Sequence, residues 1–249
     1  MTYEKVNECL ACGNQALVEV LKLTDTPLTD AYKADYMEAK CLAKYPLVCE
    51  ICNHCGHVQL KHQVSPEESY SNYLYASKVT TGLSHAFTEY ARSLSKKDSV
   101  RVLDIGSNDG SFIKACIEEG HKAYGIEPSD QLARIANENN CPTIADYFTE
   151  KVLNKLRARF NGDKFDVITF NNVLANMSAP LEALKLAKNL LKGESSKIYV
   201  QTGYHPVQFG KGLFDYIYHE HFSYLSLYTT NKIVSKFGLK IFIMFSINL

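Results

Sequence analysis

The sequence predicts an α/β protein in which a small cysteine-rich domain precedes a doubly wound, Rossmann-like sheet. Six of the eight cysteines lie within the first 55 residues. From about residue 100 onward, short apolar runs alternate with segments of helical periodicity, which is typical of βαβ units. The chain has 249 residues, 46% of them hydrophobic, which is enough for two domains and excludes disorder, collagen and a pure coiled coil.

The overall charge indicates what the chain is expected to bind and where it works. Its 27 Lys+Arg balance 27 Asp+Glu, so no broad basic surface is available for nucleic acid or an anionic membrane, and a small-molecule ligand is favoured. The sequence starts without a signal pattern, and no apolar stretch approaches the roughly 18 residues of a membrane span. We expect a cytoplasmic protein, whose cysteines are thiols or metal ligands rather than disulfides.

Residues 1–63 carry two Cys-x-x-Cys-Gly motifs about forty residues apart. Four thiolates suit one tetrahedral zinc ion, and without an evident fifth ligand the site is expected to be structural. The predicted ligands are Cys9, Cys12, Cys52 and Cys55. Cys49 and Cys52 form a competing pair, but only Cys55 is followed by a Gly, as Cys12 is, which can take a positive φ. The alternative is a set of unliganded, buried thiols.

Residues 64–98 are expected to form a helical connector. Within Ser65-Pro66-Glu67-Glu68, Ser can cap a helix, Pro suits its first position and Glu68 completes a capping box. A second apolar stripe at helical spacing follows, formed by Leu83, Phe87, Tyr90, Ala91 and Leu94.

Residues 99–249 are predicted to form the doubly wound sheet. The expected strands are 100–105, 123–126, 167–170 and 198–201, and the expected helices are 111–119, 129–139 and 179–191. Sheets of this class bind ligands at the carboxyl ends of their strands, where the strand order reverses. The residues that end these strands are therefore the candidate ligand site.

The first strand runs into a Gly-x-x-x-Gly turn and then a helix. Asp104 lies in the strand, and the turn supplies Gly106, Ser107, Asn108 and Gly110. Asp104 and Asp109 would repel a pyrophosphate, so the turn favours a cationic ligand without phosphate over a dinucleotide. The next strand ends at Glu127, where a carboxylate can accept both hydroxyls of a ribose. Together these residues predict a pocket for S-adenosylmethionine, and the alternative is a tight turn with a solvent-facing Glu127.

Amides end the strand predicted at 167–170. Asn171 and Asn172 would face the same crevice, and the alternative is that they only cap a loop. Enzymes that methylate amino groups of nucleic-acid bases usually have Asn-Pro-Pro-aromatic at this place. Here Val173 follows the two amides, which argues against a base-modifying enzyme.

The segment after the last predicted strand contains Tyr218-His219-Glu220-His221. Histidine titrates near neutrality, an adjacent Glu can orient it, and a tyrosine hydroxyl can donate to an oxyanion. These side chains are suited to proton abstraction. The alternatives are structural histidines, or a metal bound by His219 and His221, for which no further ligand set is evident.

In this order, the motifs resemble the zinc-containing sugar C-methyltransferases, which methylate C-3 of nucleotide-linked 4-keto-deoxysugars on routes to branched sugars. The resemblance spans nearly the whole chain. It includes the two cysteine motifs, Tyr73-Leu-Tyr75, Ile105-Gly-Ser-Asn-Asp-Gly110, Asn171-Asn-Val-Leu-Ala175 and Tyr218-His-Glu-His221. It implies a class I methyltransferase fold, structural zinc, S-adenosylmethionine as methyl donor and a nucleotide sugar as substrate.

The resemblance also implies roles for individual residues. His221 would be the base, with Glu220, Tyr218 and a tyrosine of the Tyr73/Tyr75 pair around the sugar. The 4-keto group acidifies the C-3 hydrogen, and the enolate carbon formed on its removal attacks the methyl group. Two rival functions remain open, an O- or N-methyltransferase that needs no enolate and a zinc-ribbon binding module without catalysis.

The chain departs from the family pattern at two places. Asn176 stands where the family commonly has His. Family members also continue for well over a hundred residues into a further C-terminal domain, whereas the apolar run 239–249 is expected to form a sixth strand with no antiparallel seventh to follow. A shortened form is therefore expected, with assembled zinc and cofactor sites, an open sugar site and weak catalysis.

Overall fold

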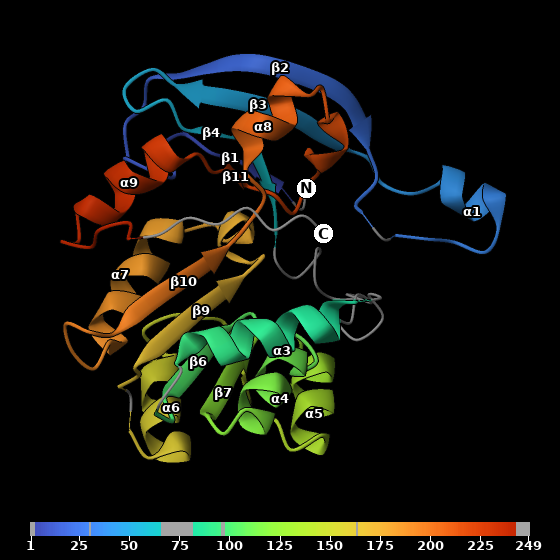
Figure 1. Cartoon of the computed structure of the whole chain (residues 1–249). Helices are drawn as coiled ribbons and strands as arrows, with labels where there is room; N and C mark the ends of the chain where they lie inside the picture. Colours follow the sequence, from blue (N-terminus) through green and yellow to red (C-terminus); the bar gives the residue numbers. More distant parts are fainter. Residues whose placement is uncertain (1–2, 30, 66–81, 96–97, 163, 243–249) are drawn as a thin grey trace. The chain divides into compact units, whose positions relative to one another are not determined.

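Two structural units make up the chain, and each is assembled from segments that are not consecutive in sequence. The computed structural model describes residues 3–29, 31–65, 82–95, 98–162 and 164–242 (Figure 1). The cysteine unit comprises Met1–Ser65, Ala175–Lys185 and Gly203–Leu249, and the α/β unit comprises Pro66–Leu174 and Leu186–Thr202. The division into consecutive domains at 1–63, 64–98 and 99–249 stays a prediction.

The α/β unit contains a parallel five-stranded sheet in the order β10-β9-β6-β7-β8. Its strands are β6 (Arg101–Ile105), β7 (Lys122–Glu127), β8 (Thr143–Ala145), β9 (Val167–Asn171) and β10 (Lys197–Gln201). The strand order reverses at β6, which pairs with β7 on one side and β9 on the other. This arrangement confirms the predicted doubly wound fold and places the ligand crevice at the ends of β6 and β9.

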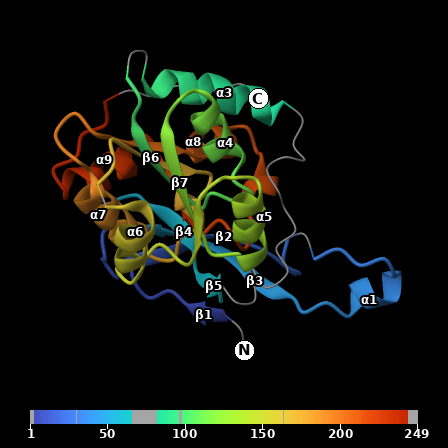
Figure 2. The same ribbon diagram turned by 90° about the horizontal axis from the view of Figure 1, so that it is seen from below.

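Helices connect and cover these strands. They are α3 (Leu83–Leu94), α4 (Ser111–Glu118), α5 (Asp130–Glu138), α6 (Val152–Phe160) and α7 (Pro180–Leu190). Figures 1 and 2 show α3, α4 and α5 gathered against one face of the sheet. There, Phe87 of α3 packs on Phe112 of α4, and both belong to a core that includes Val102 of β6. The apolar stripe predicted for residues 83–94 is therefore confirmed.

Two elements of this unit are missing from the sequence-based prediction. Strand β8 has only three residues, too few for alternation to be visible. Helix α6 buries Val152, Leu156 and Phe160, a spacing of four residues that is typical of a helix and could have predicted it.

The expected strand at 239–249 is wrong for the residues that the structure describes there. Helix α9 (Leu227–Ser235) is followed by Gly238 at a φ of 68°, and the chain from Leu239 to Phe242 forms no strand. Phe242 is 84% exposed. High β propensity alone does not make a strand, because a strand also needs a partner for its backbone groups. The rest of the run lies outside the described residues.

The cysteine unit contains an antiparallel four-stranded sheet in the order β11-β4-β3-β2. Its strands are β2 (Leu17–Thr26), β3 (Tyr45–Cys52), β4 (Val58–Leu60) and β11 (Ser223–Tyr224), and β1 (Tyr3–Lys5) pairs separately with β5 (His62–Val64). The unit also contains α1 (Tyr36–Lys40), α8 (His205–Gly210), α9 and the 3₁₀ turn η3 (Phe214–Tyr216). Helix α7 and a further 3₁₀ turn, η2 (Leu174–Asn176), each cross a boundary between the units. Strand β11 thus joins the segment after His221 to the N-terminal sheet.

The helix predicted to start at Ser65-Pro66 falls, from Pro66 onward, on residues that the structure does not describe, and so do Tyr73 and Tyr75. No helix in the described part of the chain has both the length and the hydropathy needed to cross a bilayer.

Candidate functional site

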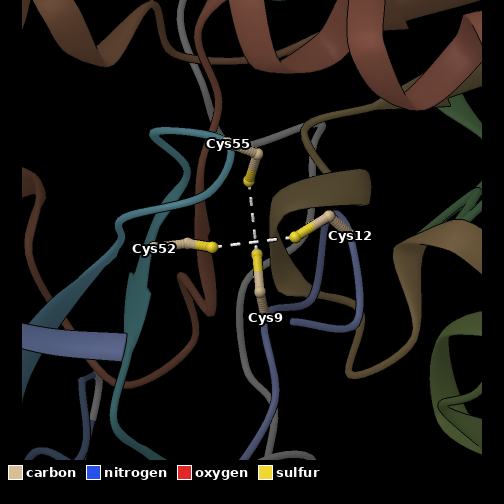
Figure 3. A group of neighbouring side chains, drawn as sticks. All are labelled: Cys9, Cys12, Cys52 and Cys55. Carbon is tan, nitrogen blue, oxygen red and sulfur yellow. Dashed lines mark hydrogen bonds between the residues drawn. The ribbon is translucent and has the colours of Figure 1, made fainter. Parts of the chain in front are cut away.

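The four predicted zinc ligands converge in the cysteine unit (Figure 3). The sulfur atoms of Cys9, Cys12, Cys52 and Cys55 all lie within 4.8 Å of one another. Two of these separations are 3.5 Å, between Cys9 and Cys55, and 3.6 Å, between Cys12 and Cys52. Four Zn–S bonds of about 2.3 Å in a tetrahedron place the sulfur atoms about 3.8 Å apart. The donor set therefore fits a structural zinc ion.

The two cysteine motifs form matching turns. Gly13 and Gly56 have φ values of 74° and 76°, and each donates its N–H over 2.8 Å to the carbonyl of the first cysteine of its motif. Cys49 lies elsewhere, buried on β3 beside Leu47 and Leu60. Among the described residues, the four cysteines are the one group of potential metal ligands, and neither His219 nor His221 belongs to such a group.

Asp104 is buried in β6 at the point where the strand order reverses. Its side chain is 2% exposed, and its Oδ1 accepts hydrogen bonds from the Thr169 hydroxyl at 2.6 Å and the Asn171 amide at 3.0 Å. Burial raises the pKa of Asp104 to about 7, the two hydrogen bonds lower it, and the nearby charge of Glu127 raises it. A cationic ligand beside this carboxyl would favour its ionised form. Thr169 was not singled out from the sequence, where it is one hydroxyl within an apolar strand.

Glu127 ends β7 and is held by two backbone groups. Its Oε2 accepts the N–H of Asn108 at 2.8 Å, and its Oε1 accepts the N–H of Ser129 at 2.9 Å. Burial raises the pKa of Glu127, while these two bonds lower it. The side chain is 6% exposed, so it does not face solvent as the alternative interpretation required. Each oxygen keeps a further lone pair, which is what a pair of ribose hydroxyls needs.

In the turn between β6 and α4, two glycines lie too close to neighbouring side chains for a residue with a Cβ. A Cβ on Gly106, whose φ is 68°, would lie 2.6 Å from Cγ2 of Val173. A Cβ on Gly110, whose φ is 78°, would lie 2.7 Å from Cβ of Cys141. Between them, Ser107 is buried and Asn108 has a φ of 52°. The two glycines are therefore required by the turn itself, and a ligand can approach its backbone closely.

Two further residues at this edge serve the local structure. Asp109 accepts hydrogen bonds from the Ser111 N–H at 3.1 Å and hydroxyl at 2.6 Å, which start α4. Asn172 has a φ of 55° and donates its backbone N–H to the carbonyl of Gln201 at 2.9 Å. Asn171 and Asn172 thus differ. The side chain of Asn171 donates a hydrogen bond to Asp104, whereas Asn172 adopts the left-handed conformation at the turn after β9.

His221 lies in the cysteine unit with both ring nitrogens engaged. Nδ1 is 2.9 Å from the carbonyl oxygen of Tyr216, so it carries the proton, and Nε2 accepts the Tyr218 hydroxyl at 2.7 Å. Burial lowers the pKa of His221, and the bond to Tyr216 raises it. The result is a neutral imidazole whose Nε2 is the basic atom.

The other residues predicted around His221 have different surroundings. His219 is buried with Nε2 3.2 Å from the Tyr45 carbonyl, as expected for a structural histidine. Glu220 is half-buried. Oδ1 of Asn176 in η2 has no hydrogen-bond partner among the described residues.

Sequence reasoning missed His205, which is 1% exposed and has its ring centroid 6.0 Å from that of His221. Burial lowers the pKa of His205 to about 4, and a proton on His221 would lower it further.

Comparison with known families agrees with this geometry. The family described as "Methyltransferase domain" matches residues 75–242. The chain belongs to this family. A second family, described as "Putative zinc binding domain", matches residues 9–70. These matches support both predicted cofactors, S-adenosylmethionine for the α/β unit and zinc for the four cysteines.

A curated relative covers almost the whole chain. C-methyltransferase NovU from Streptomyces niveus is 25% identical over 240 residues, which are 95% of this chain and 56% of that protein. The chain thus spans about half the length of this relative.

Two solved methyltransferase structures are similar to part of this chain. A "putative O-methyltransferase" from Nostoc punctiforme is 16% identical, with a TM-score of 0.51 over 64% of this chain and 51% of the other. The plantazolicin methyltransferase BpumL, solved with SAH, is 22% identical, with a TM-score of 0.48 over 62% of this chain and 61% of the other. The first likeness shows a shared fold and nothing finer.

Proposed function

We propose that this protein is an S-adenosylmethionine-dependent C-methyltransferase that acts on C-3 of a nucleotide-linked 4-keto-deoxysugar. The observation that carries the proposal is the pair His221–Tyr218, in which a neutral imidazole presents its basic Nε2 to a hydroxyl 2.7 Å away. Methylating carbon requires a base that forms a carbon nucleophile, and His221 would be that base. The name of the relative, C-methyltransferase, supports the same chemistry.

The α/β unit would hold the cofactor. When bound, S-adenosylmethionine supplies an electrophilic methyl group on a sulfonium. Glu127 would accept the ribose hydroxyls with the lone pairs that Asn108 and Ser129 leave free, and Asp104 would face the cationic part of the ligand. The turn from Gly106 to Gly110 would let the ligand lie against the backbone.

The cysteine unit would hold and deprotonate the sugar. On substrate binding, the Tyr218 hydroxyl would move its hydrogen bond from Nε2 of His221 to the ketone oxygen, and Nε2 would then take the C-3 proton. The bond from Nδ1–H to the Tyr216 carbonyl would stabilise the imidazolium that forms. The Tyr218 hydroxyl would donate to the enolate oxygen, while Glu220 and a tyrosine of the Tyr73/Tyr75 pair would line the sugar. A positioned base contributes about 10²–10⁴-fold, and an oxyanion donor about 10²–10³-fold.

The reaction can be tested with methyl-labelled cofactor and a panel of nucleotide 4-keto-sugars. We expect label on a sugar carbon, identified as C-3 by NMR. An O- or N-methyltransferase would instead label a substrate that lacks the ketone. Label on oxygen or nitrogen, or no label with any keto-sugar, would overturn the proposal.

The base is tested by His221→Ala. We expect unchanged cofactor affinity in calorimetry and loss of the exchange of the C-3 hydrogen with solvent deuterium, because only the base acts in that step. The matched control is His85→Ala, which removes an exposed imidazole from α3. Exchange at the wild-type rate in His221→Ala would assign the base to another residue.

A further inference from the structure

The cysteine motifs and the proposed base belong to one antiparallel sheet. Strand β4 begins three residues after Cys55, and β11 begins two residues after His221. The two strands pair, with Ser223 opposite Gln59. The N–H of Leu60 also donates to the carbonyl of Phe222, the residue next to His221, at 3.0 Å. The backbone that carries the base is therefore fixed to the strand that leaves the second cysteine motif.

The side chain of His57 reinforces this link. It is fully buried, at 0% exposure, and its Nε2 lies 3.3 Å from the hydroxyl of Ser223. Its own carbonyl accepts the N–H of Cys52 at 2.8 Å. His57 thus contacts a predicted zinc ligand through its backbone and β11 through its ring.

Gln59 makes the corresponding link to the first cysteine motif. Its side chain, also fully buried, accepts the N–H of Leu10 at 2.8 Å and donates to the carbonyl of Glu8 at 3.1 Å. These two backbone groups flank Cys9. Gln59 stands opposite Ser223 in the sheet, so its side chain links the first cysteine motif to β11. The side chain of His57 links the second motif to the same strand.

A second anchor lies on the other side of the base. His219 faces the carbonyl of Tyr45, at the start of β3, over 3.2 Å. His221 is thereby held between two attachments to the same sheet, one before it and one after it. A base fixed in this way loses little freedom when substrate binds, and a misplacement of about 1 Å can cost about 10²-fold in rate.

We propose that the zinc-binding motifs position the base, with His57 and Gln59 as positioning residues that act on His221 through β11. This inference rests on the proposed function, because it takes His221 as the base. It gives the metal site a role in the geometry of the reaction besides its role in folding.

The test compares two substitutions of His57. His57→Leu keeps the residue apolar and buried but removes the bond to Ser223, and His57→Gln can place an amide nitrogen near the position of Nε2. We expect His57→Leu to slow exchange of the C-3 hydrogen by about 10–100-fold, and His57→Gln to restore most of it. Zinc content and cofactor affinity are expected to stay unchanged in both.

A second readout does not depend on activity. The ¹⁵N shifts of the His221 ring report which nitrogen carries the proton, and in the wild type we expect Nδ1–H alone. His57→Leu should add a second set of His221 signals, and His57→Gln should not. The control is His54→Leu, an exposed histidine in the same motif, which should change neither readout.

Ser223→Ala removes the same hydrogen bond without altering a cysteine motif, and it replaces His57→Leu if that variant loses zinc. Wild-type exchange and wild-type His221 signals in Ser223→Ala would overturn the inference. If the wild type itself exchanges no keto-sugar hydrogen, the proposed function fails, whereas the ring signals still show whether His57 positions His221.

Discussion

The two units bury their polar groups in different ways. In the α/β unit, the strands have apolar interiors such as Leu103 and Ile168, and buried carboxyls such as Asp104 and Glu127 lie toward the strand ends. In the cysteine unit, the short strands carry or adjoin fully buried polar side chains, including His57 and Gln59. Burial of apolar surface can sustain the first unit, whereas the second has a smaller apolar core and is expected to need its metal ligands and specific hydrogen bonds as well. Single substitutions should therefore affect the two units very differently.

The largest effect is expected from Cys52→Ser, which removes a zinc ligand. Apparent zinc binding contributes roughly 10–16 kcal/mol in small zinc domains, comparable to the whole folding free energy of a domain. We expect zinc to fall from about one per chain to well below that value. Hydrogen exchange should speed up throughout the cysteine unit, while the α/β unit stays protected.

Cys49→Ser is the matched control, because Cys49 is buried on the same strand but lies outside the four-cysteine group. The variant should keep its zinc. Its free energy of unfolding should fall by only about 1–3 kcal/mol, because the substitution places a hydroxyl in an apolar cluster. If Cys49→Ser lost zinc and Cys52→Ser kept it, the ligand assignment would be wrong.

A smaller effect is expected from Asp104→Asn, which should increase the stability of the protein instead of lowering it. The pKa of Asp104 is about 7 in the folded chain and about 3.9 in an unfolded one. Because the folded value is higher, the stability from the protonated form is complete below about pH 4 and lost as the pH rises through 7. The substituted amide would keep an acceptor for Thr169 without a charge, so the variant should be more stable at pH 8, by up to about 4 kcal/mol.

Urea unfolding followed by circular dichroism at pH 4 and pH 8 checks this prediction, since the two proteins should converge at the lower pH. Cofactor binding should weaken in the same variant, because the negative charge is lost. A variant that is no more stable than the wild type at pH 8 would mean that the ionised carboxylate of Asp104 does not destabilise the folded protein.

The smallest effect is expected from Glu127→Ala. Losing charge-assisted hydrogen bonds to a ribose should weaken cofactor binding by roughly 1.5–3 kcal/mol in calorimetry. Glu127→Gln keeps an acceptor for one of the two backbone N–H groups and should fall between Ala and the wild type. An unchanged dissociation constant in Glu127→Ala would leave Glu127 a purely structural role.

The sequence predicted the α/β unit better than the cysteine unit, for physical reasons. Apolar runs that alternate with helical segments, and the turn from Gly106 to Gly110, are local signals that can be read without knowing which strands pair. The two-residue strand β11 has no signal of its own, because only its partner β4 makes it a strand. The buried links made by His57 and Gln59 were invisible for the same reason. The Cys-x-x-Cys motifs were predictable because metal ligation imposes a fixed spacing.

The pairing of β11 with β4 also sets an order in which the molecule can be built. The two members of the bond between His57 and Ser223 are 166 residues apart in the chain. At roughly 5–20 residues per second, a ribosome needs about 10–30 s to make that stretch. Until then, β4 has an open edge that can pair with another chain. The cysteine unit thus stays incomplete while the five strands of the α/β unit, which lie between β4 and β11 in the sequence, are made, although its four predicted zinc ligands are already present.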